Sequence, residues 1–413
     1  MSVDVKMAWR NIWRNPRRSI LTITAIAFAS LLLVFMLSFQ FGSYDTMINA
    51  AVKIHTGHLQ VQAKGYQDKR SMRLVVPDPN AIGSIMDETP GIEAYTYRAN
   101  AFSLVSSKER TYGIMVIGID PVREANVSTL KKVIRQGSYL SEEDTDQALV
   151  GELLAKNLQV GLGDELVVLG QGRDGSIAAT VVRVKGIYNS GQDEFDRSSI
   201  HIPLRHFQDV YAMRGAVHEV VALGTSLAKI PAIKRSVAKA VASQDPKHEL
   251  VVLDWMDLMP GLVEGIQLDL MSGLILYVIL IVVVAFSILN TFLMAVFERT
   301  KEFGVLMAIG TTPGRLTKVL LLESLTMTIV GVVIGMIAGS MVTWYFEVHG
   351  ISVAGTSEVV RQFGIPERMF PQLSVLSLSI GPILVLFITS LAALYPALKV
   401  RRLRPVEALT SVQ

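Results

Sequence analysis

The side chains with catalytic potential are few, and they are not grouped as an active site requires. His55 and His58 have an H-x-x-H spacing, but a metal site needs further ligands, and the neighbouring sequence supplies none. The acids of SGQDEFD (190–196) have the chemistry of a general acid–base pair, yet no nucleophile or metal-ligand set accompanies them. We therefore expect surface or partly buried imidazoles and a polar loop.

Nucleotide-binding signatures are also incomplete. Gly170, Gly172 and Gly175 form a G-x-G-x-x-G, but that fingerprint must follow a strand and open a helix. Here SIAATVVRVKG follows, which has the pattern of a second strand, so we expect a hairpin loop. No G-x-x-x-x-G-K-[ST] occurs, and GTTPGRLT (310–317) lacks both the lysine and the spacing. We therefore predict that the chain is not an enzyme and that it binds no cofactor or metal ion.

The composition indicates a membrane protein. Half of the 413 residues are hydrophobic and 18% are charged, whereas a soluble domain has about 25% charged residues. The absence of cysteine excludes disulfides and thiolate metal sites. A net charge of +3 gives no reason to expect nucleic acid as a partner.

Four apolar segments are long enough to cross a bilayer, which takes about 20 residues. They run from Ile20 to Phe41, Gly273 to Phe297, Val319 to Phe346 and Val375 to Leu398. Among acidic and basic residues only Glu323 intrudes, near one end of the third segment. Four such runs in one chain are rare outside membranes, so we expect four transmembrane helices. The first is longer than the apolar region of a signal peptide and is predicted to stay as an anchor.

Basic residues near the ends of the spans predict the orientation. They cluster before the first span, between the second and third, and after the fourth: Lys6, Arg10, Arg14, Arg17, Arg18, Arg299, Lys301, Arg315, Lys318, Lys399, Arg401, Arg402 and Arg404. We therefore expect both termini and the loop 298–318 on the cytoplasmic side of the membrane, and the segment from about 43 to 271 on the outer side. Residues 4–16 place Val5, Trp9, Ile12 and Trp13 at helical spacing, which is typical of a helix in the membrane interface.

The segment 43–271 has the pattern of a folded α+β domain inserted between the first two spans. Period-2 or β-branched runs predict strands. These runs are 57–63, 110–119, 164–171, 178–188, 198–204, 218–224 and 248–255. Helical periodicity marks 147–160 and 226–243.

Two features near the third span suggest helix docking and helix packing. VFERTKEFGVLMAIGTTPGRL (296–316) is charged, helix-like and closed by glycine and proline. By itself it is either a topology loop or a docking element. Gly331, Gly335 and Gly339 recur every four residues, which permits close approach of two helices, within the chain or at a moving or dimer interface.

The layout and several segments together resemble the MacB/FtsX-like permeases of type VII ABC transporters, above all the lipoprotein-releasing LolC/LolE subunits. The similar segments are LMAIGTTPGRL (306–316) with Arg299, Glu302 and Gly304 before it and Glu323 after it, VIGIDP (116–121), 150–166 and 395–409. The resemblance covers nearly the whole chain. It implies an external domain with a porter-like lobe and a sabre-like lobe at about 121–214.

The resemblance also implies that 298–318 is a coupling helix that docks on a separate cytosolic ATPase, which uses ATP and Mg. The implied contact residues are Glu298, Arg299, Lys301, Glu302, Phe303, Gly304, Leu306, Ile309 and Gly310. The charged ones would pair across the interface, and Phe303, Val305, Leu306 and Ile309 would enter a groove. Two ATPase copies would bind two permeases, the second being a copy of this chain or a paralogue.

The function that the resemblance implies is ATP-driven release of lipoproteins from the bacterial inner membrane, with a periplasmic acceptor as a candidate partner. The alternatives are MacB-like export of peptides or small molecules and FtsX-like activation of a cell-wall hydrolase. A cavity for acyl chains would be lined by Phe35, Met36, Phe39, Leu274 and Tyr277.

The predicted division of the chain is an interfacial helix (1–18), spans (19–42, 272–297, 319–346, 375–398), an external domain (43–271), a coupling helix (298–318), an external loop (347–374) and a tail (399–413).

Overall fold

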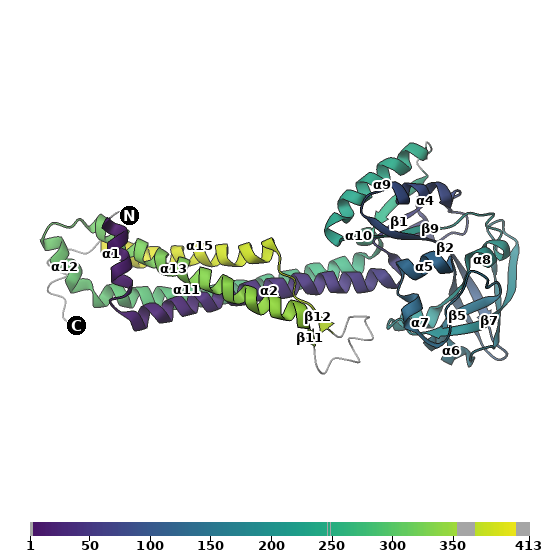
Figure 1. The fold of residues 1–413 in the computed structure, drawn as a ribbon, viewed down its shortest axis with the longest axis horizontal. Helices are drawn as coiled ribbons and strands as arrows, with labels where there is room; N and C mark the ends of the chain where they lie inside the picture. The colour runs from purple at the N-terminus through teal and green to yellow at the C-terminus, as the bar shows by residue number, and fades with distance from the viewer. Residues whose placement is uncertain (1–2, 246, 248, 353–367, 402–413) are drawn as a thin grey trace. The chain divides into compact units, whose positions relative to one another are not determined.

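The computed structural model describes residues 3–245, 247, 249–352 and 368–401, which form two compact units (Figure 1). The membrane unit contains residues 3–44, 266–352 and 368–401, and the sheet unit contains residues 45–265. Helices α2 (Pro16–Ala51) and α11 (Pro260–Glu298) each begin in one unit and end in the other. The sheet unit is therefore inserted between the first two long helices, as the sequence predicts.

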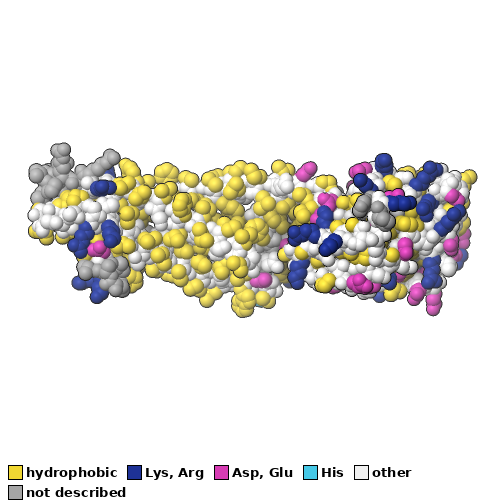
Figure 2. Space-filling model, turned by 90° about the horizontal axis from the view of Figure 1, so that it is seen from above, with side chains coloured by type: hydrophobic (Ala, Val, Ile, Leu, Met, Phe, Trp, Pro, Cys, Tyr) yellow, Lys and Arg dark blue, Asp and Glu magenta, His cyan; other side chains and the backbone are white. Residues whose placement is uncertain are grey.

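Four described helices are long and apolar enough to span a membrane: α2, α11, α13 (Pro313–His349) and α15 (Val375–Arg401). Figure 2 shows hydrophobic side chains over most of the surface that these helices form. The helices extend beyond the apolar runs, because polar residues at their ends continue the helical hydrogen bonding. Strands β11 (Ile351–Ser352) and β12 (Arg368–Met369) pair with each other within the predicted loop 347–374. Most of that loop and of the tail 399–413 lies outside the described residues.

The N-terminal helix α1 (Val3–Ile12) packs against α13 through one side. Ala8 and Ile12 are buried, and Ile12 belongs to the same apolar cluster as Ile26 of α2. Trp9 and Trp13 stay about half exposed, with their rings edge to face at 6.0 Å. The residues predicted to face the membrane interface therefore have different environments. Ile12 packs in the protein core, and the indole rings of Trp9 and Trp13 remain exposed and available to the membrane interface.

The glycine stripe of α13 packs against α2 of the same chain. A Cβ atom on Gly331 would lie 2.8 Å from the Cβ of Ile26, and one on Gly339 would lie 3.1 Å from the Cβ of Val34. One on Gly335 would collide with the carbonyl oxygen of Ala27. Glycine is needed here because the two helix backbones approach closely. The stripe is therefore an intrachain packing surface.

Replacing Gly335 by leucine is expected to destabilise the membrane unit by about 3 kcal/mol, because an overpacked site against backbone cannot relax. Thermal unfolding in detergent is the measurement. Gly265→Leu is the matched control, since nothing lies within 4 Å of a Cβ at that helical glycine. Equal melting temperatures for the two variants would contradict the packing argument.

The sheet unit is built on a ten-stranded mixed sheet in the order β10-β1-β9-β2-β3-β8-β5-β7-β4, with β6 paired to β2 and β7. The strands are β1 (Leu59–Ala63), β2 (Ile92–Ser106), β3 (Thr111–Ile119), β4 (Ile134–Gly137), β5 (Gln147–Gly151), β6 (Glu165–Gln171), β7 (Ile177–Tyr188), β8 (Ser199–Pro203), β9 (Glu219–Gly224) and β10 (Leu250–Asp254). The helices are η1 (Val52–Thr56), α3 (Tyr66–Lys69), α4 (Pro79–Glu88), α5 (Pro121–Val127), η2 (Leu130–Val133), α6 (Glu152–Leu158), α7 (Asp193–Ser198), α8 (Leu204–Val210), η3 (Leu227–Lys229), α9 (Ile230–Gln244) and α10 (Trp255–Leu258).

The sheet has an open half and a closed half. In the open half, α4 and α9 cover one face of β10, β1, β9 and the start of β2, with Met86 and Val237 in the shared core. In the closed half, β2, β3, β8, β5, β7 and β6 return to β2 and form a barrel around a second core. Strand β2 belongs to both halves, because its first part pairs with β9 and its last part with β6.

The barrel explains where the sequence prediction and the structure differ. Residues 147–151, predicted as the start of a helix, form β5, and the helix α6 begins only at Glu152. Ala148, Leu149 and Val150 are fully buried, so burial on both faces hides the period of a strand. The long strand β2 had no clear signal for the same reason, and it joins the open half and the closed half in one sheet. The predicted hairpin at Gly170–Gly175 is confirmed between β6 and β7.

Three buried histidines predict acid sensitivity of the sheet unit. Burial lowers the pKa of His58 to about 4, of His201 to about 3 and of His218 to about 4. Their folded pKa lies below the unfolded value of about 6.5, so the unfolded state takes up protons first, and stability falls as the pH drops below that value. Each histidine contributes roughly 1.4 kcal/mol per pH unit to this loss.

The melting temperature of the full chain should therefore be constant above about pH 7 and fall steadily between pH 6.5 and 4.5. Thermal unfolding followed by intrinsic fluorescence tests this. His201→Phe should reduce the slope, because the ring can still pack against Tyr188 and Phe195. A slope that this variant leaves unchanged would show that His201 does not carry the effect.

Candidate functional site

The charged stretch between the second and third spans forms the short helix α12 (Thr300–Ala308). The chain leaves helical geometry at Arg299, so α12 is separate from α11. At its other end, Gly310 has a φ of +100°, the N–H of Gly310 donates to the Met307 carbonyl, and the N–H of Thr311 donates to the Leu306 carbonyl. This is a Schellman ending, which requires glycine for the left-handed residue. The sequence GTTPG therefore ends α12 and returns the chain into α13.

One side of α12 is buried within the chain. Phe303 is only 2% exposed, and with Met307 it packs against Val296, Leu320 and Val400. Gly304 is buried next to it, and Leu306 is half-buried at the edge of the cluster. This corrects one expectation: Phe303 cannot enter a groove on a partner, because it is already part of the membrane unit's core.

The opposite side of α12 is free in the described chain. Lys301, Val305 and Ala308 are exposed at helical spacing, and Ile309 follows at the tip. Val305 is 52% exposed and Ile309 is 76% exposed. An apolar tip beside a lysine is a surface suited to protein docking.

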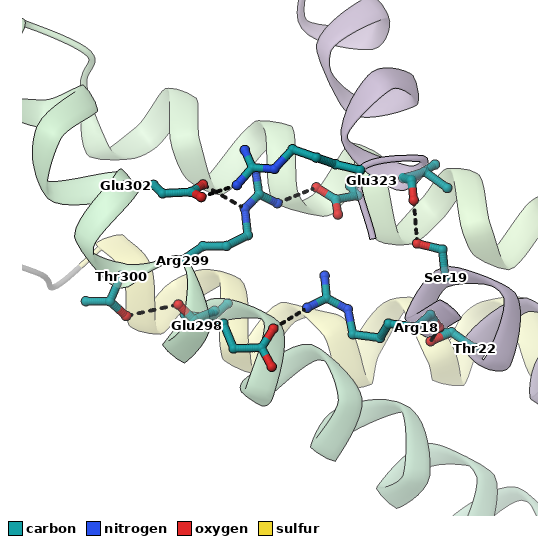
Figure 3. Close-up of polar contacts among 11 residues, drawn as sticks. Arg18, Ser19, Thr22, Glu298, Arg299, Thr300, Glu302 and Glu323 are labelled. Atoms are coloured by element: carbon teal, nitrogen blue, oxygen red, sulfur yellow. Dashed lines mark hydrogen bonds and ion pairs between the residues drawn. The ribbon is translucent and has the colours of Figure 1, made fainter. Parts of the chain in front are cut away.

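Arg299 lies at the centre of a network of ion pairs (Figure 3). Its guanidinium is 3.1 Å from a carboxylate oxygen of Glu323 and 3.4 Å from one of Glu302, and it lies over the Phe303 ring. Arg299 and Glu323 are both buried, whereas Glu302 is more exposed and also pairs with Arg14. Glu323, the intruding acid of the third span, is therefore neutralised inside the protein.

Further ion pairs attach the N-terminal segment to the same region. Arg18 donates to Glu298 at 3.0 Å (Figure 3). Asp4 of α1 accepts from Arg315 at 3.1 Å and lies 3.6 Å from Lys318. Arginines that the sequence indicates as topology signals thus have specific partners. The sequence around these residues shows their charge but does not identify their ion-pair partners, because the partners are about 300 residues away in the chain.

The charges of the site are set by these contacts. Burial by itself would raise the pKa of Glu302, but the hydrogen bond and charge of Arg14, followed by Arg299, outweigh it and lower that pKa. Glu302 is therefore a carboxylate at neutral pH. Glu298, Arg299 and Glu302 pair within the chain rather than across an interface as expected. Among the residues that the structure describes, Lys301 is the one of these four charges without an ion-pair partner.

Of the five residues predicted to line an acyl cavity, Phe35, Met36 and Phe39 belong to α2, and Leu274 and Tyr277 belong to α11. Phe35 packs with Phe39 at 6.3 Å and with Phe346 of α13 at 5.8 Å. Tyr277 of α11 instead donates a hydrogen bond to Gln40 at 2.8 Å, and Leu274 is about half exposed. Met36 is half-buried one helical turn before Gln40. The structure therefore brings together Phe35 and Phe39, and separately places Tyr277 beside α2.

Comparison with protein families gives two matches. The MacB-like periplasmic core domain matches residues 19–240, and the FtsX-like permease C-terminal family matches residues 274–405. Together they cover most of α2, most of the sheet unit, the helix α12 and most of the last three membrane helices.

Individual relatives agree with these matches. The chain is 26% identical over 396 residues to the lipoprotein-releasing system transmembrane protein LolC of Xylella fastidiosa, covering 91% of this chain and 89% of that one. It is 22% identical to the macrolide export ATP-binding/permease protein MacB of Nitrobacter winogradskyi, covering 96% of this chain and 58% of that one.

Among solved structures, the periplasmic region of MacB from Actinobacillus actinomycetemcomitans aligns with 51% of this chain and 94% of its own length, at 15% identity and a TM-score of 0.39. With the family matches over both parts, four membrane helices and the inserted sheet unit, the chain belongs to the FtsX-like permeases with a MacB-like periplasmic core domain, the transmembrane subunits of ABC transporters.

Proposed function

We propose that this permease docks a separate ABC ATPase on the exposed side of α12, formed by Lys301, Val305, Ala308 and Ile309. The observation that carries the proposal is the 76% exposure of Ile309 and 52% exposure of Val305 on a helix whose other side is fixed in the core. A rigid apolar tip transmits a push from a partner, because its buried side and the Arg299 pairs attach it to three other helices.

The partner set follows from the family. Two ATPase copies, which use ATP and Mg, serve two permeases, the second being this chain again or a paralogue. The most apolar part of α11 is only 11% buried within this chain, against 39% for α2 and α13. Its apolar surface is therefore left for lipid, for substrate or for the second permease. We place the protein in the bacterial inner membrane, with both termini and α12 on the cytoplasmic side, since basic residues concentrate there.

The proposed substrate is a lipoprotein held in the outer leaflet of that membrane. The LolC relative named above, which covers 91% of this chain, supports this choice. Each buried CH₂ of an acyl chain stabilises insertion by about 0.8 kcal/mol, so extraction of several chains needs ATP. Export of a peptide or small molecule, as in MacB, is the second candidate, favoured by the match of the periplasmic core domain and by the MacB relative.

The test is reconstitution of the permease with the ATPase that copurifies with it, in vesicles that contain a triacylated lipoprotein. ATP-dependent release of the lipoprotein to a soluble fraction is expected, and it should be absent with a non-hydrolysable analogue. A complex that hydrolyses ATP but releases no lipoprotein would contradict the substrate proposal and favour MacB-like export. Failure of any ATPase to bind would contradict the docking proposal.

A further inference from the structure

The helix α2 ends in an unusual element inside the sheet unit. Its last turn, η1 (Val52–Thr56), is a π-helix, closed by Gly57 at a φ of +71°. Short π-helical turns cost hydrogen-bond geometry and are frequent at functional sites. The end of the first membrane helix is therefore a place where the chain is held in a less favourable geometry by its surroundings.

Arg98 of β2 is the side chain that reaches this element. Its Nε donates to one oxygen of Glu124 at 3.0 Å, and a terminal nitrogen donates to the other oxygen at 2.6 Å. The remaining terminal nitrogen donates to the backbone carbonyl of His55 and lies 3.3 Å from the His55 ring nitrogen Nδ1. Arg98 is 1% exposed and Glu124 is 2% exposed, so this is a fully buried, bidentate pair with a third acceptor on η1.

Other contacts hold η1 from both halves of the sheet unit. The Lys53 carbonyl accepts from the N–H of Thr129 at 2.8 Å, next to α5 and η2. The His55 ring lies 5.4 Å from the ring of Phe195 in α7, on the barrel side. His58 follows η1 and accepts from the N–H of Gly224 at the end of β9. The π-turn is thus tied to the open sheet, to α5 and to the barrel.

Arg98 lies at the point of the sheet where β2 changes its pairing partner. It is the residue at which β2 ends its pairing with β9 and begins its pairing with β3. Force applied to η1 therefore reaches the one strand that belongs to both the open half and the barrel. A buried ion pair contributes little to stability compared with an apolar pair of similar volume, so its specific geometry calls for another explanation.

We propose that Arg98, oriented by Glu124, is the positioning residue that clamps the end of the first membrane helix to the sheet unit and transmits the movement of that helix to β2. The transmission part of this inference rests on the proposed function, because it presupposes an ATP-driven movement of the helix. The clamp part rests only on the contacts around η1.

The clamp is tested first in the purified full-length chain, in lipid nanodiscs. The variant Arg98→Met/Glu124→Met replaces the ion pair by an apolar pair and leaves no buried charge unpaired. Its melting temperature should stay close to that of the wild type. Amide hydrogen exchange of residues 52–56 should become at least about tenfold faster, because η1 loses its side-chain anchor. Unchanged protection of these amides would overturn the inference.

The control is Arg123→Met, which removes an arginine of the same helix α5 that lies over the rings of Tyr95 and Tyr97 rather than on η1. It should leave exchange at 52–56 unchanged. If the double variant fails to fold, the milder Arg98→Lys tests the same point, because lysine cannot bridge both Glu124 oxygens and His55, and faster exchange at 52–56 is again expected.

Transmission is tested in the complex with the copurified ATPase. The double variant should hydrolyse ATP at the wild-type rate but release lipoprotein at least about tenfold more slowly, because ATP hydrolysis is no longer coupled to movement of the sheet unit. Wild-type release by a variant with unprotected η1 would overturn the transmission role. If the wild-type complex itself releases nothing, the proposed function fails, and the exchange experiment still decides whether the clamp exists.

Discussion

Replacing Val305 and Ile309 together by aspartate is expected to abolish assembly with the ATPase while the permease stays folded. Both side chains are exposed, so the substitutions remove no core contacts of the chain. Two carboxylates in an apolar interface stay unpaired on docking, and each hot-spot loss costs about 2 kcal/mol or more, so affinity should fall by at least about a hundredfold. Copurification and a binding titration in detergent measure the effect.

The matched control for this variant is Ile177→Asp, an isoleucine 82% exposed on the β6–β7 hairpin of the sheet unit. It introduces a carboxylate at an exposed apolar position away from α12, and this variant should bind the ATPase as the wild type does. Phe303→Ala is not a suitable test of docking, because Phe303 is buried and its loss would destabilise the core of the membrane unit. Wild-type affinity in the double aspartate variant would show that the ATPase docks elsewhere.

Replacing Arg299 by alanine is expected to destabilise the membrane unit by about 3–5 kcal/mol, because it leaves the buried carboxylate of Glu323 without a partner. Glu302 and Phe303 lose contacts at the same time. Thermal and denaturant unfolding in detergent measure the loss, and the complex with the ATPase should weaken because α12 is no longer held rigidly.

The double variant Arg299→Met/Glu323→Met separates charge from packing. It should recover most of the lost stability, since apolar residues of similar volume replace a buried ion pair at little cost. Lys301→Ala, at an exposed position of the same helix, should change stability by less than about 0.5 kcal/mol. If Arg299→Ala were as mild as Lys301→Ala, the ion pair with Glu323 would not hold α12 in place.

Within the sequence, local periodicity was sufficient for the membrane architecture. Apolar runs of about 20 residues and period-2 strands are properties of neighbouring residues, so the four spans and the inserted α+β domain could be predicted. The Schellman ending of α12 was readable from Gly310 in the same way, because a left-handed residue favours glycine.

The face of α12 could not be predicted from its sequence. Phe303, Val305, Leu306, Met307 and Ile309 are apolar on all sides of a helix of nine residues, so no stripe tells buried from exposed positions. Only packing against Val296, Leu320 and Val400 decides that Phe303 points inward and Val305 outward. The sequence prediction included residues from both sides of α12, whereas the docking surface proposed from the structure contains only the residues of its exposed side.

The sequence by itself determined the class of protein, its order of elements and the family that it resembles, because these depend on composition and local spacing. The tertiary structure decided which charges find each other: Arg299 with Glu323, Arg14 with Glu302, and Arg98 with Glu124 and His55. It also closed the barrel, by pairing β6 with β2 across about 60 residues. Long-range pairs of this kind depend on the whole folded chain, and they leave no mark on the spacing of either partner.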